Sequence, residues 1–212
     1  MIIQYLGHSC FRLESKDISC IIDPFSKEIG IRAPRINDNI VLVSHSHYDH
    51  NNIQGAPSNA FVVQNPGEYE VKNIYLRGIR SYHDKSQGAE RGPNNIYVID
   101  IEEIKVCHLG DLGQEKLTDS QVDEIGDIDV LMIPVGGTYT INYKEASEIV
   151  NQIEPKIVIP MHYKVRGLKL DIDGPEKFIK ELGLTPEKVD KLKLAKKLLP
   201  SEEMKLVVFE NA

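Results

Sequence analysis

The chain has 212 residues, with 25 Lys and Arg against 32 Asp and Glu, so its formal net charge is −7. The length fits one globular domain over residues 1–212, and no apolar run approaches the ~18–20 residues of a membrane-spanning helix. Three cysteines without C-x-x-C spacing and no visible secretory signal argue against an exported disulfide protein and predict a cytoplasmic one, and the acidic balance disfavours a nucleic-acid partner.

Short β-rich runs dominate the first half of the chain. The run that ends at Asp23-Pro24 stops there because proline cannot donate to a β-ladder. The apolar run 40–44 is typical of a strand buried on both faces. The predicted strands are 2–6, 10–14, 18–22, 40–44, 61–64, 73–80, 96–101 and 103–109, followed later by 130–134, 157–160 and 205–209.

Helices are expected only in the second half. Thr118 can cap a helix that runs to about residue 125. Apolar residues recur at helical spacing through 143–153, and Pro175 and Gly183 bracket a third helix over 175–182. The Lys-rich segment 187–197 is expected to be a solvated helix face. This order predicts an α/β (α+β) fold with two sheets and helices outside them.

The most informative motif is Ser44-His45-Ser46-His47-Tyr48-Asp49-His50, directly after the buried strand. His45 and His47 can point the same way if the backbone stays extended, while Asp49 and His50 lie past the turn. Imidazole nitrogens and carboxylate oxygens are the ligands that zinc and similar divalent ions prefer. Because a catalytic ion needs at least three protein ligands, four residues split into two pairs require further ligands from elsewhere in the chain.

This H-x-H-x-D-H motif resembles the metallo-β-lactamase superfamily, and the resemblance extends over nearly the whole chain. The Gly7-His8-Ser9-Cys10 and Asp23-Pro24 motifs look like its lactonase-like and uncharacterised hydrolase branch. Glu90-Arg91-Gly92 and the segments 107–113 and 134–140 are similar to a small bacterial and archaeal subgroup of zinc-dependent hydrolases. The fold so implied is the αββα sandwich of two mixed sheets with helices outside and the site at one edge.

The resemblance also implies a ligand set for two divalent ions, with zinc first and manganese or iron as alternatives. It assigns the first ion to three imidazoles, the second to two imidazoles and a carboxylate, and a further carboxylate to a bridging position. In order, these residues are His45, His47 and His83; Asp49, His50 and His162; and Asp111.

Other residues are expected around the ligands. We predict catalytic roles for Asp49, which can orient the nucleophile or move its proton, and for His8, which can contact substrate or support a ligand. Supporting or substrate-binding roles are predicted for the remaining candidates, each with a purely structural or solvent-exposed role as its alternative; these are Asp23, Asp84, Arg91 and His108.

The resemblance implies a metal-dependent hydrolase with a metal-bridging hydroxide nucleophile, acting on an ester or lactone of a small metabolite. A phosphodiesterase acting on a small or nucleotide-like substrate is the near alternative, because the same kind of site serves both reactions. A non-enzymatic metal-binding or regulatory protein on the same fold is the alternative from another class. The expected partner is a small molecule that can be anionic, with no membrane; the exposed edges of the fold are compatible with a homo-oligomer.

Overall fold

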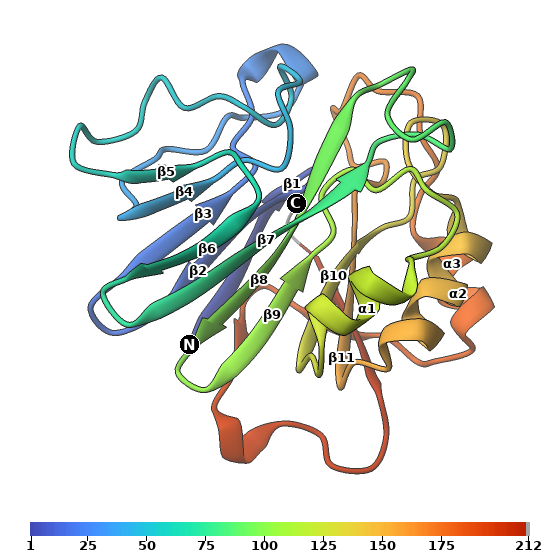
Figure 1. Ribbon diagram of the computed structural model, residues 1–212. Coiled ribbons are helices and arrows are strands. Elements are labelled where there is room, and N and C mark those ends of the chain that lie inside the picture. Colours follow the sequence, from blue (N-terminus) through green and yellow to red (C-terminus); the bar gives the residue numbers. More distant parts are fainter. Residues whose placement is uncertain (211–212) are drawn as a thin grey trace.

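The computed structural model describes residues 1–210 and contains two mixed sheets packed face to face (Figure 1). The first sheet has six strands in the order β13-β1-β2-β3-β4-β5. The β1–β2 and β2–β3 pairs are antiparallel, and β3, β4 and β5 are parallel. Its strands are β1 (Ile2–Gly7), β2 (Cys10–Glu14), β3 (Ser19–Ile22), β4 (Ile40–Leu42), β5 (Phe61–Val63) and β13 (Leu192–Lys193).

The second sheet has eight strands in the order β12-β14-β11-β10-β9-β8-β7-β6. Its β6–β9 part is an antiparallel meander, and the remaining strands are parallel. Its strands are β6 (Gly67–Val71), β7 (Ile74–Tyr82), β8 (Pro93–Ile101), β9 (Ile104–His108), β10 (Val130–Pro134), β11 (Ile157–Met161), β12 (Glu187–Val189) and β14 (Lys205–Phe209).

The helices α1 (Asp119–Ile125), α2 (Tyr143–Ile153) and α3 (Glu176–Leu182) lie together outside the eight-stranded sheet (Figure 1). Capping boxes start α1 at Thr118 and α2 at Asn142. Because Ala146, Ile149 and Val150 share one face of α2, burying them attaches the helix to the sheet. Short 3-10 helices are η1 (Lys27–Ile29) and η2 (Lys196–Leu198).

Two groups of apolar side chains stabilise these layers. The larger fills the space between the sheets and continues under the α-helices. The smaller lies on the other face of the six-stranded sheet, where Phe25, Ile29 and Leu168 from connecting segments cover Ile21 and Val41. The two mixed sheets expected for this fold are therefore confirmed. Among residues 1–210 the α-helices lie outside the eight-stranded sheet, whereas loops and η1 cover the outside of the first sheet.

Two segments differ from the sequence-based expectation. The helix face expected in 187–197 is wrong, because this segment forms β12 and β13, which pair with β14 and β1 at the edges of the two sheets. The edge strand β6 was not predicted, since its sequence is polar and mostly exposed. Both errors concern short edge strands whose conformation depends on pairing with distant strands more than on local propensity.

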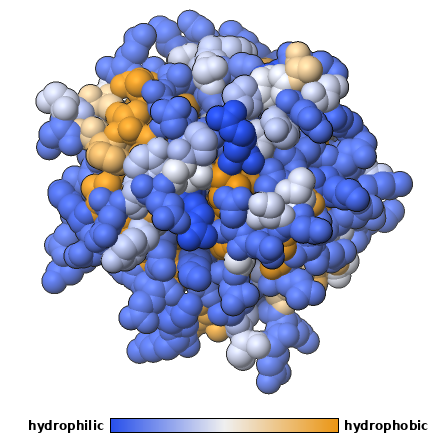
Figure 2. Space-filling model, in the orientation of Figure 1, coloured by the Kyte–Doolittle hydropathy of each residue, from blue (hydrophilic) through white to orange (hydrophobic). Residues whose placement is uncertain are grey.

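The six-stranded sheet also exposes an apolar edge. Phe61 and Val62 of β5 keep 41% and 39% of their surface exposed. Figure 2 shows a mostly hydrophilic face with an apolar group at its upper left, over the region of β5. Among residues 1–210, no helix combines the length and apolar character needed to cross a membrane. The three cysteines, Cys10, Cys20 and Cys107, are buried free thiols.

Candidate functional site

The candidate residues converge at one edge of the sandwich because they follow strands that run in the same direction. His45 to His50 follow β4, and Asp23 follows the parallel strand β3. In the other sheet, His83, Asp111 and His162 follow β7, β9 and β11. Since the carboxyl ends of such strands meet, five segments far apart in sequence supply side chains to one place.

The first group of nitrogen donors contains His45, His47 and His83, and their donor atoms lie within 4.8 Å of one another. The Nδ1 atom of His45 lies 2.9 Å from the Ser44 hydroxyl, which orients the ring. The buried Nε2 of His45 has no hydrogen-bond partner among residues 1–210. A buried imidazole nitrogen without a partner is unfavourable unless something else binds it, and this group therefore fits a cation.

The second group contains His8, His50 and His162, again with donor atoms within 4.8 Å of one another. The chain turns after His47, whose carbonyl accepts from the backbone N–H of His50. This turn carries His50 away from the first group. The buried Nδ1 atoms of His8 and His162 have no hydrogen-bond partner in the described part of the chain.

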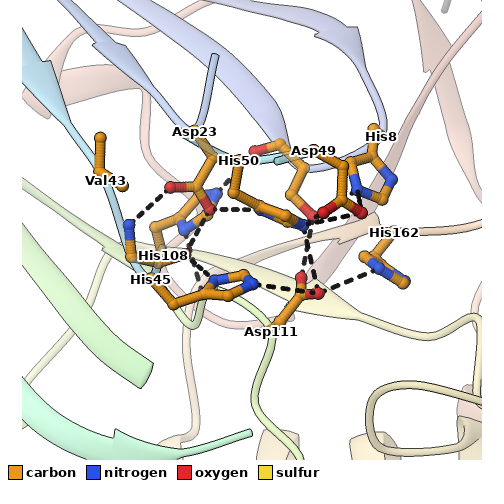
Figure 3. Close-up of polar contacts among 12 residues, drawn as sticks. His8, Asp23, Val43, His45, Asp49, His50, His108, Asp111 and His162 are labelled. Atoms are coloured by element: carbon orange, nitrogen blue, oxygen red, sulfur yellow. Dashed lines mark hydrogen bonds and ion pairs between the residues drawn. The ribbon is translucent and has the colours of Figure 1, made fainter. Parts of the chain in front are cut away.

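Asp111 lies between the two groups (Figure 3). Its Oδ2 atom is 3.4 Å from Nε2 of His83 in the first group, and 3.2 Å from Nε2 of both His50 and His162 in the second. Nε2 of His45 is further away, at 3.9 Å. One carboxylate oxygen thus faces donors from both groups, as a bridging position requires.

The protonation states of these side chains suit metal binding. Burial lowers the pKa of His45 and His83, and burial together with His162 lowers that of His8 to about 4, so these rings are neutral near pH 7. Burial alone would raise the pKa of Asp111, but His162 and His50 hold it well below its usual range. The site therefore combines three neutral imidazoles with an ionised carboxylate, which are the states that bind divalent ions. His50 differs, because burial alone would lower its pKa but Asp111 and Asp23 raise it well above the usual value, so a bound ion has to displace its proton.

Asp23 positions residues of the site through its hydrogen bonds. Its carboxylate accepts from the backbone N–H of Ser44 at 2.7 Å and from the Ser44 hydroxyl at 2.6 Å, and lies 3.0 Å from Nδ1 of His50. Burial alone would raise the pKa of Asp23, but the hydrogen bond with His50 lowers it. A carboxylate on the far nitrogen of an imidazole fixes its tautomer and leaves Nε2 free for another bond.

His108 and Asp84 face away from the donor groups. Nε2 of His108 is 2.9 Å from the Ser9 carbonyl, and its Nδ1 accepts from the Gly110 N–H. The Asp84 carboxylate accepts from four backbone N–H groups of the following loop, including that of Arg91 at 2.7 Å. These residues shape the loops on which the site is built.

Asn94 is a site residue that sequence reasoning missed. Its Oδ1 accepts from the Asp111 N–H at 3.0 Å, and its Nδ2 donates to the Leu109 carbonyl and the Ser81 hydroxyl. These bonds fix the turn that presents Asp111. A single asparagine in a strand carries no sequence signal, whereas Ser44, also missed, adjoins the histidine motif.

Comparison with known proteins identifies the family. Residues 2–162 match a family model that is described as "beta-lactamase superfamily domain". A UPF0173 metal-dependent hydrolase of Thermoplasma volcanium is 30% identical over 74% of this chain and 81% of its own length. A UPF0173 metal-dependent hydrolase of Pyrococcus horikoshii is 29% identical over 96% of this chain and 99% of its own. The chain belongs to the metallo-β-lactamase superfamily, in its UPF0173 group of metal-dependent hydrolases.

A solved structure agrees with this membership. The crystal structure of a metallo-β-lactamase superfamily protein from Thermotoga maritima has a TM-score of 0.81 and 39% identity, and covers 98% of this chain and 97% of its own. The expected resemblance and the expected fold class are both confirmed.

A pocket of about 370 Å³ opens over the donor groups of this metallo-β-lactamase superfamily member. His47, Asp49 and His162 line it from within. Tyr48 and Tyr139, which are 58% and 37% exposed, belong to its lining together with Arg91. The guanidinium carbon of Arg91 is 5.7 Å from the centre of the Tyr139 ring. Arg91 has no ion-pair partner in the described part of the chain, so its charge is available to a ligand.

Proposed function

We propose that this metal-dependent hydrolase holds two divalent ions, zinc first among them, and cleaves an ester or lactone of a small metabolite. The observation that carries the proposal is the position of Asp111 Oδ2, which lies within 3.4 Å of Nε2 of His83, His50 and His162. The proposed ligands of the first ion are His45, His47 and His83, and those of the second are Asp49, His50 and His162, with Asp111 shared.

Two divalent ions held close together acidify water, polarise a substrate oxygen and stabilise the charge that develops on it. Asp49 is the side chain suited to move protons. Its Oδ2 lies 3.2 Å from Nε2 of His8, and the residue lines the pocket. Burial alone would raise the pKa of Asp49, but the hydrogen bond with His8 lowers it, so Asp49 is ionised near pH 7. In the proposed reaction Asp49 takes a proton from the attacking water and returns it to the leaving alcohol oxygen.

Arg91 supports a substrate that carries a negative charge. Among residues 1–210 its guanidinium has no ion-pair partner, and it lies over the Tyr139 ring at the pocket. A carboxylate or phosphate group on the metabolite would bind the Arg91 guanidinium in a bidentate manner. The pocket volume of about 370 Å³ suits a small molecule and not a polymer.

The test combines metal analysis with a substrate panel. Protein stripped by a chelator and reloaded with zinc is assayed on lactones, carboxylic esters and phosphodiesters, beside a His47→Gln variant and a Lys85→Ala control. We expect about two ions per chain and metal-dependent ester or lactone hydrolysis, retained by Lys85→Ala and lost by His47→Gln. Hydrolysis of phosphodiesters alone would refute the proposal that the enzyme cleaves a carboxylic ester or lactone bond. Two bound ions with no turnover on any class would favour the non-enzymatic alternative.

A further inference from the structure

His8 is a fully buried imidazole that the ligand set proposed above does not use. It lies in the turn between β1 and β2, and its ring points toward His50 and Asp49 (Figure 3). Its Nε2 atom is 3.0 Å from Nε2 of His50 and 3.2 Å from Oδ2 of Asp49. The rings of His8 and His162 lie 4.5 Å apart between centroids. His8 is thus close to Asp49, His50 and His162, which are three of the four side chains assigned to the second ion.

The distances from His8 Nε2 to His50 and Asp49 are compatible with atoms that share one ion. With metal–nitrogen bonds of about 2.0–2.1 Å, two ligands on the same ion lie about 2.9–3.4 Å apart, depending on the angle between them. The His8–His50 distance of 3.0 Å falls in this range, as does the 3.2 Å distance from His50 to Asp111. The distance from Asp49 Oδ2 to His50 Nε2 is 3.8 Å and falls outside it. By this criterion His8 fits the second position better than Asp49 does.

The backbone holds His8 in this place. Its φ of +58° is in the left-handed region, which non-glycine residues rarely adopt and which is frequent at functional sites. The His8 carbonyl accepts from the Tyr5 hydroxyl and from the backbone N–H of His162, both at 2.7 Å. His162 is also left-handed, with φ of +51°. The two turns therefore fix each other, and the positions of the two imidazoles are linked.

We propose that His8 Nε2 is a ligand of the second ion, beside His50 and His162. This inference rests on the proposed second ion and replaces Asp49 by His8 in its ligand set. With Asp111, the three imidazoles give the second ion four protein ligands. Asp49 is then not required to hold the ion and is free to move protons.

The direct test uses the intact protein loaded with ¹¹³Cd and labelled with ¹⁵N in its histidine rings. Scalar coupling between ¹¹³Cd and a ring nitrogen reports a bond to that nitrogen and does not depend on activity. We expect coupling at Nε2 of His8, His50 and His162, and none at His108, whose two ring nitrogens already have protein partners. Coupling at His50 and His162 without coupling at His8 would overturn the proposal.

The number of bound ions separates this inference from the proposed function. One ion coupled to His8, His50 and His162 would support the inference and contradict the dinuclear site. One ion coupled only to the first group would contradict both. Absence of hydrolysis would leave the coupling result unaffected.

Variants add a quantitative test. Loss of a residue that only positions a ligand weakens metal binding by about 10–100-fold, so loss of a true ligand is expected to cost about 100-fold or more. We expect His8→Gln to show this loss for the second ion with little change for the first, and Asp49→Asn to keep the second ion within about 10-fold. The opposite order of the two variants would overturn the proposal. Circular dichroism of both metal-free variants checks that they fold.

Discussion

Asp23 Oδ2 lies 3.0 Å from Nδ1 of His50, and the same oxygen accepts the hydroxyl of Ser44, which in turn contacts Nδ1 of His45. His45 belongs to the first group of nitrogen donors and His50 to the second. One buried carboxylate therefore orients an imidazole in each group, and Ser44 is the link between them. Asp23, at the end of β3, therefore links the orientation of His45 in the first donor group to that of His50 in the second. The histidine motif alone does not reveal this link.

Replacement of Asp23 should accordingly weaken both proposed ions. In Asp23→Asn the amide nitrogen cannot accept a hydrogen bond, so either Ser44 or His50 loses its partner. We expect affinity for both ions to fall by about 10–100-fold, as measured by competition with a chromophoric chelator. Asp129→Asn, which alters a buried carboxylate away from the site, is the matched control. Unchanged affinity in Asp23→Asn would show that the contact does not orient these ligands.

Asp129 itself predicts a pH dependence of stability. It accepts from Lys156 Nζ at 2.6 Å, Lys196 Nζ at 3.0 Å and the backbone N–H of Lys105 at 3.0 Å. Burial alone would raise the pKa of Asp129, but these bonds, that of Lys156 first, lower it. A lowered native pKa means that the stabilisation is present above the unfolded pKa of about 3.9 and is lost as pH falls through the native value.

Asp129→Asn should therefore lower the free energy of unfolding by about 1–3 kcal/mol at pH 7. Because both lysine side chains are nearly half exposed, the loss should lie at the lower end of this range. The difference from the parent protein should shrink below about pH 4, where the Asp129 carboxyl is protonated first in the unfolded chain and then, at its lower native pKa, in the folded protein. Urea unfolding of both proteins at several pH values measures this difference in the free energy of unfolding. A difference that stays constant down to pH 3 would show that the stabilisation does not come from the ionised Asp129 carboxylate.

The site could be located from the sequence because its residues are concentrated in recognisable motifs. The run from His45 to His50 and the turns at His83, Asp111 and His162 carry the resemblance, and the structure brings all of them to one edge. The supporting contacts could not be found in this way. Asn94 is one polar residue in a strand, and its bond to Asp111 depends on the pairing of β8 with β9.

The same reasoning explains the errors in the fold. The buried strands β10 and β11 are continuous apolar runs, and the amphipathic helix α2 has apolar residues at helical spacing. These local patterns predict the three elements nearly at their true bounds. The strands β6, β12 and β13 are polar, short and at sheet edges. Their conformation depends on partners more distant in sequence or on a hairpin turn, so no local pattern reveals it.

Arg91 should determine the preference for charged substrates. Its guanidinium, which has no ion-pair partner among the described residues, lies at the pocket and can bind an anionic group on the metabolite. That contact is made before and during the reaction. We expect Arg91→Ala to raise KM for an anionic ester by about 10-fold or more, corresponding to a loss of about 1.5–3 kcal/mol, with a smaller change in kcat. A neutral ester of the same size is the control substrate and should be hydrolysed equally well by both proteins.

Arg91→Lys distinguishes charge from geometry. A lysine keeps the positive charge but cannot make a bidentate contact, so an intermediate KM is expected. If Arg91→Ala affects neutral and anionic esters alike, the residue acts by supporting its loop through Asp84 and not by binding substrate.

Gly136 lies so close to His162 that it should be essential for the second group of donors. A Cβ at Gly136 would be 2.1 Å from the carbonyl oxygen of His162, a distance that forces the backbone apart. The His162 N–H is bonded to the His8 carbonyl, so the shift would disturb both turns. We expect Gly136→Ala to destabilise the fold by about 1–3 kcal/mol and to lower occupancy of the second ion while sparing the first.

Gly55→Ala is the matched control, because a Cβ at Gly55 meets no atom within 4 Å. Metal analysis after dialysis against limiting zinc, together with thermal unfolding, compares the two variants. Gly55→Ala should retain the occupancy of the parent protein. Equal occupancy in Gly136→Ala would mean that the His162 turn can move without loss of the ion, and that the close approach of the two loops does not fix the metal ligands.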